Sequence, residues 1–226
     1  VGTENGLSRL HHAVAHGRED VIIRTYNAGS GLESNKILCS FQDDQNTLWV
    51  GTESGGVCLM SEGSERFSCF NPAEKLLGKS GQTLRVQAIT QDKSRGDIWM
   101  GSNLGVFHYN RSGIRLNYFG KEQGLKHVAA DALCPDAQGN IWVVTEKGGL
   151  ARIQNGQVQS YGKREGLLHE NLYCITGDKK GMLWLGTEGG GIYSFDGTVF
   201  RNYSTDHGLS SENVYSIISD DDNNIW

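Results

Sequence analysis

All five tryptophans of the 226-residue chain lie in one recurring phrase, and this repetition constrains the fold more than any other feature. The phrase places an apolar residue before the Trp and a short strand-like run after it. It occupies the segments 47–53, 97–103, 140–146, 182–188 and 223–226. Successive tryptophans are 50, 43, 42 and 42 residues apart. A period of about 40–50 residues built from short strands is typical of β-propeller blades.

One complete period shows how such a blade is built. Short runs rich in β-branched and aromatic residues, each bounded by Gly, Asp or Asn, predict four antiparallel strands. These runs are 172–176, 182–187, 191–195 and 198–203. An isolated sheet of this kind exposes two apolar faces, so we expect neighbouring blades to stack and each Trp to pack between them.

The repeats divide the whole chain, 1–226, into five periods of a single all-β propeller domain. The approximate boundaries are 1–49, 50–99, 100–142, 143–184 and 185–226. The chain opens on the residues that follow a Trp and closes on Trp226, so its two ends are in register. We therefore expect five four-stranded blades closed by pairing of the N- and C-terminal segments. The alternative is a five-blade arc of a larger propeller.

Composition agrees with an all-β chain. Glycine supplies 31 residues and proline only 2, which predicts many tight turns and few long helices. The first two periods carry insertions at 10–29 and 61–83. A single helical turn is expected at 71–77, with Asn71 as its cap and Pro72 at its first position. No apolar run approaches the roughly 18 residues of a membrane span, and no leader opens the chain.

The five cysteines contain no Cys-x-x-Cys spacing, which argues against a zinc ribbon. Cys39, Cys134 and Cys174 lie in apolar strand-like runs and are expected in the core. Cys58 and Cys69 are close in sequence and are able to pair, but spacing alone leaves that question open.

Charge and motifs narrow the function. The net charge of −5 argues against a nucleic-acid partner, because such a protein needs a basic surface. The sequence holds no nucleophile elbow and no phosphate-binding loop. We therefore expect no catalysis, no metal and no cofactor in this chain.

Strand order predicts where a ligand would bind. In a four-stranded meander, the linkers between blades and the hairpins between second and third strands share one face. Loops on a rigid scaffold commonly carry function. The rim candidates are the hairpin residues Glu4, Glu53, Asn103, Glu146 and Glu188, the linker histidines His127, His169 and His207, and the residues beside the first strand Lys36, Arg85, Asn171, Asn213, Tyr173 and Tyr215.

The chemistry of these residues suggests a polar collar. Carboxylates accept hydrogen bonds from sugar hydroxyls, and tyrosine rings stack on sugar faces. Tyr173 and Tyr215 either face the central channel or pack between blades, and the sequence does not decide between these positions. The carboxylates belong to separate blades, which argues against the close acid/base pair of a glycosidase.

A resemblance rests on the segments 185–197, 200–204 and 208–220. These strongly resemble the two-component regulator propeller repeat, which occurs in periplasmic sensor regions of bacterial histidine kinases and hybrid two-component systems. The resemblance implies a periplasmic, ligand-sensing module, commonly in a seven-bladed ring, with a small molecule or oligosaccharide as ligand. Self-association or contact with partner domains is also implied. Free cysteines are unusual in an oxidising periplasm.

A second resemblance supplies the alternative function. The segment 139–153 is similar to repeats of streptogramin lyase, a propeller enzyme with a His and a Glu near its channel mouth and a Mg²⁺ ion. This resemblance implies that His169, with Glu146 or Glu188, would be the catalytic candidates.

Overall fold

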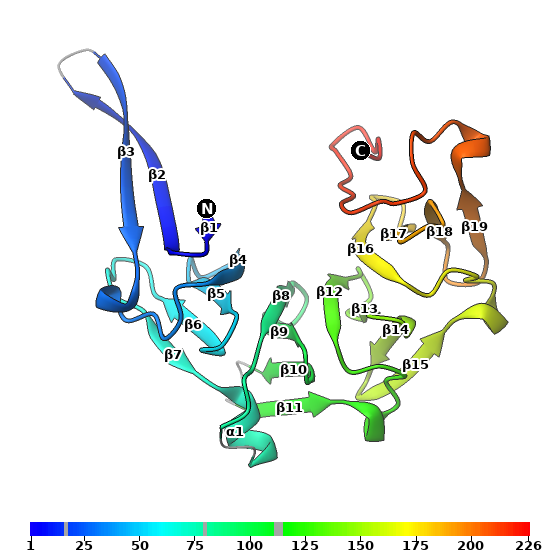
Figure 1. Ribbon diagram of the computed structural model, residues 1–226, viewed down its shortest axis with the longest axis horizontal. Helices are drawn as coiled ribbons and strands as arrows, with labels where there is room; N and C mark the ends of the chain where they lie inside the picture. Colours follow the sequence, from blue (N-terminus) through cyan, green and yellow to red (C-terminus); the bar gives the residue numbers. More distant parts are fainter. Residues whose placement is uncertain (16–17, 79–80, 111–114) are drawn as a thin grey trace. The chain divides into compact units, whose positions relative to one another are not determined.

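The computed structural model describes residues 1–15, 18–78, 81–110 and 115–226 (Figure 1). Its regular elements are antiparallel strands, one short α-helix and four 3₁₀ turns. The chain divides into two compact units, Val1–Ile89 and Thr90–Trp226.

The first unit contains two sheets. A three-stranded sheet consists of β1 (Gly2–Thr3), β2 (Gly6–Ala15) and β3 (Arg18–Tyr26). A four-stranded sheet follows, with β4 (Ile37–Gln42), β5 (Leu48–Thr52), β6 (Val57–Met60) and β7 (Ser68–Phe70). The helix α1 (Pro72–Leu77) begins as predicted, because the Asn71 side chain accepts hydrogen bonds from the backbone of Ala73 and Glu74.

Three further four-stranded sheets follow along the chain. The first contains β8 (Val86–Asp92), β9 (Asp97–Ser102), β10 (Gly105–Asn110) and β11 (Arg115–Phe119). The second contains β12 (Ala130–Pro135), β13 (Ile141–Thr145), β14 (Gly149–Gln154) and β15 (Gln157–Tyr161). The third contains β16 (Leu172–Gly177), β17 (Leu183–Thr187), β18 (Ile192–Phe195) and β19 (Phe200–Tyr203). Each sheet is a meander of consecutive strands. The four strands predicted between residues 172 and 203 are confirmed as β16 to β19, with ends that agree to within two residues.

The two ends of the chain differ from the expected closed ring. The sheet of β1, β2 and β3 has three strands, all from the first 26 residues, and the insertion at 10–29 lengthens the pairing of β2 with β3. The segment 213–226 pairs with itself, through backbone hydrogen bonds between Ile218 and Trp226 of 3.0 and 2.9 Å. Trp226 is 72% exposed. Among the described residues the expected closing sheet is therefore not formed, and the strand pairing is consistent with the alternative.

A short 3₁₀ turn recurs in four linkers and was not predicted. The turns are η1 (Ala28–Ser30), η2 (Lys121–Gln123), η3 (Lys163–Glu165) and η4 (Thr205–His207). Each ends at a glycine with φ between 94° and 109°, a conformation that favours Gly over residues with a side chain. A leucine follows each glycine, and Leu32, Leu125 and Leu167 are buried. These leucines anchor the linkers to the core.

An aspartate fixes the Trp in four of the five repeats. The indole Nε1 of Trp49, Trp142, Trp184 and Trp226 donates to an Asp six residues earlier, at 2.7, 2.9, 3.2 and 2.8 Å. The same carboxylate also closes the intervening turn. In the third repeat, Asp136 Oδ1 accepts from the backbone N–H of Gln138 at 3.0 Å and of Asn140 at 2.9 Å. One carboxylate thus holds the turn and orients the indole.

Packing between sheets also depends on the repeated phrase. Trp142 contacts Tyr161 of its own sheet and Phe195 of the next, with ring centroids 5.6 and 5.7 Å apart. This confirms the expected packing of a Trp between blades. Gly186, two residues after Trp184, permits close approach, since a Cβ there would lie 2.5 Å from the Val214 carbonyl oxygen.

The cysteines divide into one disulfide and three free thiols. Cys58 and Cys69 form a disulfide between the paired strands β6 and β7. Cys134 is buried, and Cys39 and Cys174 are half-buried. Burial raises the pKa of Cys39 to about 12 and that of Cys134 to about 11. These thiols therefore stay neutral and unreactive near neutral pH.

Removal of a turn carboxylate should destabilise the protein. In Asp136→Ala, the indole of Trp142 and the turn amides lose their acceptor, so we expect a loss of about 2–4 kcal/mol in the free energy of unfolding. Urea unfolding measures this loss. Asp206→Ala, at an exposed aspartate of η4, is the control and should change stability by less than about 0.5 kcal/mol. Equal effects of the two substitutions would contradict the assigned role.

Alkylation tests the thiol assignment. Native protein treated with iodoacetamide at about pH 8, without reductant, should remain unmodified, because burial keeps the free thiols protonated. After unfolding without reductant, mass spectrometry should find Cys39, Cys134 and Cys174 modified and Cys58 and Cys69 intact. Labelling of Cys58 in the unreduced protein would refute the disulfide.

Candidate functional site

Hairpins and linkers meet at the same edge of the sheets. In three sheets, the first residue of the hairpin between the second and third strands donates its backbone N–H to the carbonyl of the residue that precedes the first strand. The pairs are Glu53 with Lys36 at 3.0 Å, Glu146 with Ala129 at 3.0 Å, and Glu188 with Asn171 at 2.9 Å. This repeated contact holds the predicted rim carboxylates beside the linkers.

Two hollows adjoin the second and third sheets of the unit Thr90–Trp226. The larger has a volume of about 440 Å³ and is lined by Asp131, Glu146, Lys147, Asn171, Leu172, Tyr173 and Glu188. The smaller, about 260 Å³, is lined by Lys147, Lys163, Leu168, His169, Glu170, Asn171 and Glu188. Lys147, Asn171 and Glu188 belong to both, so we call the two hollows together the rim pockets.

Side chains at the rim pockets make one short hydrogen bond and two longer ion pairs. Asn171 Nδ2 donates to Glu188 Oε2 at 3.0 Å. Lys147 Nζ lies 3.5 Å from Glu146 Oε1, and Lys126 Nζ lies 3.9 Å from Glu170 Oε1. The pockets therefore present carboxylate acceptors together with amide and ammonium donors. Such a lining suits a ligand rich in hydroxyl groups.

Two tyrosines extend the larger pocket. Tyr173 and Tyr215 stack with ring centroids 5.1 Å apart and an interplanar angle of 23°. Tyr173 is 36% exposed and Tyr215 is 71% exposed. Desolvation and then a hydrogen bond with the Glu188 carboxylate raise the pKa of the Tyr173 phenol. The sequence left open whether these tyrosines face the channel or pack between blades. The exposure of Tyr215 excludes burial between blades for that residue.

The three linker histidines are anchored separately. His169 Nδ1 lies 2.9 Å from the hydroxyl of the buried Tyr193, and His169 alone of the three lines the rim pockets. His127 Nδ1 accepts from the Ala129 backbone at 3.3 Å, and His207 Nδ1 accepts from the Ser204 backbone at 3.2 Å. Within the described residues no group of three or more His, Cys, Asp or Glu is arranged to hold a metal.

The structure gathers some of the predicted rim residues and not others. Those that line the rim pockets are Glu146, His169, Asn171, Tyr173 and Glu188. Asn213 lies beside the same hairpin, since its Oδ1 accepts from Gly189 N at 2.8 Å. Asn103 is half-buried at the β9–β10 turn.

The other rim candidates belong to the unit Val1–Ile89 and do not line these pockets. Lys36 Nζ forms an ion pair with Glu53 Oε1 at 3.0 Å. Glu4 and Arg85 are exposed. Their role in ligand binding remains a prediction.

Six pocket residues were missed by the sequence analysis, the polar Asp131, Lys147, Lys163 and Glu170 and the apolar Leu168 and Leu172. Lys147 follows the predicted Glu146 in the hairpin and adopts a positive φ of 54°. Glu170 precedes Asn171 and accepts from the backbone of Lys163 at 3.3 Å, which ties the end of the linker to η3. For Lys147 and Glu170, adjacency to predicted residues was the available signal.

Comparison with known proteins agrees with this architecture. A family model described as two component regulator propeller matches residues 31–54 and 166–189. The matched segments run from a linker through the first two strands to the hairpin, and the second contains His169, Asn171, Tyr173 and Glu188. No curated protein matches the chain.

Several solved structures share the fold. The extracellular domain of the putative hybrid two component system BT3049 from B. thetaiotaomicron is 24% identical, with a TM-score of 0.78, and the match covers 100% of this chain and 29% of that one. The corresponding domain of BT4673 is 22% identical, with a TM-score of 0.76, covering 100% of this chain and 31% of that one. Virginiamycin B lyase from Staphylococcus aureus is 12% identical, with a TM-score of 0.69, covering 97% and 67%.

These matches settle the fold class. The chain spans less than a third of the length of the two extracellular-domain structures from B. thetaiotaomicron that it matches. In the described part of the chain, no helix is long and apolar enough to cross a membrane. The four-stranded sheets are blades of a β-propeller, and two linker-to-hairpin segments of the chain match the family model of the two component regulator propeller.

Proposed function

We propose that this chain is the ligand-sensing part of a bacterial two-component signalling protein, and that it binds a small molecule or oligosaccharide at the rim pockets without catalysis. The observation that carries the proposal is the hollow of about 440 Å³ formed by Glu146, Asn171, Tyr173 and Glu188. Its volume is in the usual range for small-molecule sites, about 300–1,000 Å³.

The chemistry of this hollow suits a sugar. Glu146 and Glu188 supply acceptors for hydroxyl groups, and the Asn171 amide is oriented by its 3.0 Å bond to Glu188. The stacked rings of Tyr173 and Tyr215 offer a flat surface beside the carboxylates. Aromatic rings contribute large contact area at low conformational cost, and their polar ends remain hydrated.

Two observations support a location outside the cytoplasm. The Cys58–Cys69 disulfide is of a kind that persists in oxidising compartments and is rare in the cytosol. The similar sensor structures are extracellular domains. We infer a periplasmic module that reports ligand binding through self-association or through partner domains of the parent protein.

An enzymatic alternative rests on one observation. His169 and Glu188 line the same hollow of about 260 Å³, and these are residues that the resemblance to streptogramin lyase selects. The Nδ1 atom of His169 is engaged by Tyr193 at 2.9 Å, which orients the imidazole. A general base must lie within hydrogen-bond reach of the proton it abstracts.

Binding is tested with an oligosaccharide panel and isothermal titration calorimetry. For an oligosaccharide that binds the wild type, Glu188→Gln should weaken affinity about tenfold, because it removes a charged acceptor. Glu53→Gln is the matched control at the equivalent hairpin and should retain affinity, since Glu53 does not line the pockets. The proposal fails if no oligosaccharide binds, or if both variants bind as the wild type does.

Lyase activity is tested with quinupristin, the ligand in a structure of the inactive lyase. We expect no conversion of quinupristin by the wild-type chain when the reaction is followed by chromatography. Turnover that disappears in His169→Ala would favour the enzyme over the sensor.

A further inference from the structure

The second complete Trp repeat lacks the contact that holds the other indoles. Trp99 is 7% exposed, and its Nε1 is buried with no hydrogen-bond partner among the described residues. In each of the other repeats a carboxylate occupies this position. A buried donor without an acceptor is unfavourable, so Trp99 retains an unused capacity to bind an oxygen atom.

A longer turn withdraws the carboxylate from Trp99. Asp92 precedes Trp99 by seven residues, whereas the spacing is six in the other repeats. The positive-φ residue of the turn, Gly96 here and Gly139 in the next sheet, keeps its distance of three residues from the Trp. The additional residue therefore lies in 93–95. Asp92 Oδ1 instead accepts from Ser94 N and Oγ, at 2.9 and 2.6 Å.

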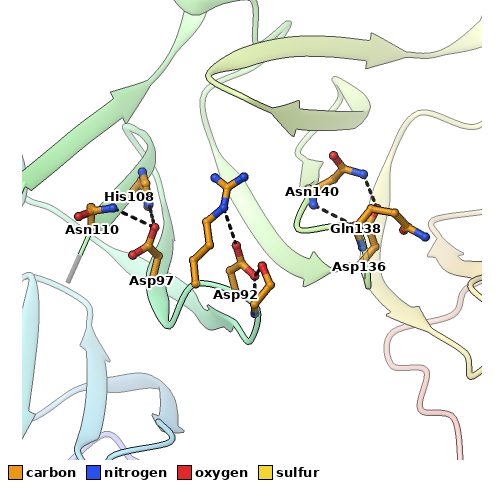
Figure 2. Close-up of polar contacts among 9 residues, drawn as sticks. Asp92, Asp97, His108, Asn110, Asp136, Gln138 and Asn140 are labelled. Atoms are coloured by element: carbon orange, nitrogen blue, oxygen red, sulfur yellow. Dashed lines mark hydrogen bonds and ion pairs between the residues drawn. The ribbon is translucent and has the colours of Figure 1, made fainter. Parts of the chain in front are cut away.

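The residue after that glycine also departs from the pattern. Asn140 in the next sheet donates from Nδ2 to Asp136 at 2.8 Å, but the second repeat has Asp97 at this place. Asp97 Oδ2 lies 2.9 Å from His108 Nε2 and accepts from Asn110 Nδ2 at 3.2 Å, and Figure 2 shows both side chains directed at it. His108 stacks on Trp99 with ring centroids 4.0 Å apart and an angle of 12°.

A hollow of about 400 Å³ adjoins this altered repeat. Its lining includes Arg95, Trp99, His108, Asn117, Phe119 and Ile153. None of its lining residues lines the rim pockets. The lining contains aromatic and apolar surface, amide and guanidinium donors, and no carboxylate.

We propose that this hollow binds a small carboxylate carried on a flat or cyclic carbon skeleton. The ligand carboxylate accepts hydrogen bonds from Trp99 Nε1–H and from Arg95, and thereby supplies the group that aspartate supplies in the other repeats. The skeleton packs against Phe119 and Ile153. This assignment is independent of the rim pockets and of the proposed sensor function.

Two carboxylates and the guanidinium of Arg95 lie near this position. The two nearby carboxylates are already engaged, Asp97 by His108 and Asn110, and Asp92 by Ser94. Arg95 lies at the loose distance of 3.9 Å from Asp92 Oδ2, and its side chain is 55% exposed. Arg95 is therefore able to turn toward a ligand without breaking a short ion pair. Charge-assisted bonds from a guanidinium to a carboxylate are among the stronger polar contacts.

Benzoate is a suitable probe, with benzamide as its neutral counterpart. In ¹H–¹⁵N spectra the chain should give five indole signals, and Trp99→Phe identifies the one from Trp99. Saturable displacement of the Trp99 signal by benzoate, and not by benzamide, is the expected result. No displacement, equal displacement by both compounds, or displacement of another indole alone would overturn the proposal.

Two variants separate the carboxylate site from general binding. Arg95→Gln should weaken benzoate binding about tenfold. Deletion of Lys93 restores the six-residue spacing between Asp92 and Trp99, so the protein's own carboxylate should occupy the site and abolish benzoate binding. Glu188→Gln, in the rim pockets, should leave benzoate binding unchanged. Unchanged affinity in Arg95→Gln would refute the site even where the deletion variant does not fold.

Discussion

The bond between an aspartate and an indole N–H six residues later recurs in four of the five repeats and joins the turn of each repeat to its Trp. One carboxylate satisfies the amides of a tight turn and also fixes a large aromatic ring, as Asp136 does for Trp142. The ring then packs against aromatic residues of the next sheet. Local turn chemistry and packing between sheets are thus coupled through a single side chain. In the second repeat the spacing is longer by one residue, and Trp99 loses this bond.

The packed sheets leave one edge, where the linkers meet the hairpins, available for ligand binding. The 3₁₀ turns, each ended by a glycine and three of them followed by a buried leucine, bring the linkers beside the hairpins. Repeated backbone contacts such as Glu188 N to Asn171 O keep the two together. These backbone contacts fix the edge, so its polar side chains can be arranged for a ligand. The same side chains are not needed to stabilise the core. The proposed sensing role depends on this separation between core and rim.

Much of the fold could be predicted from local patterns in the chain. The strands β16 to β19 and the helix α1 lie where alternation, turn residues and the Asn71–Pro72 cap predicted them. The expected closure of the chain ends is not formed, and the 3₁₀ turns were not predicted. Register of the ends does not ensure pairing: β1 pairs with β2, whereas the backbone of Trp226 bonds to Ile218. At the site, Glu146, Asn171, Tyr173 and Glu188 were predicted, whereas Lys147 and Asp131 were not.

By itself the sequence determined the repeat, the strand order and the edge at which linkers meet hairpins, because these depend on periodicity and turn chemistry within short stretches. Only the tertiary structure decided which side chains from different sheets come together. The hollow shared by Lys147 and Asn171 depends on that packing, as does the hollow that Trp99 and Ile153 line together. These arrangements depend on distances between residues far apart along the chain, and periodicity contains no information about those distances.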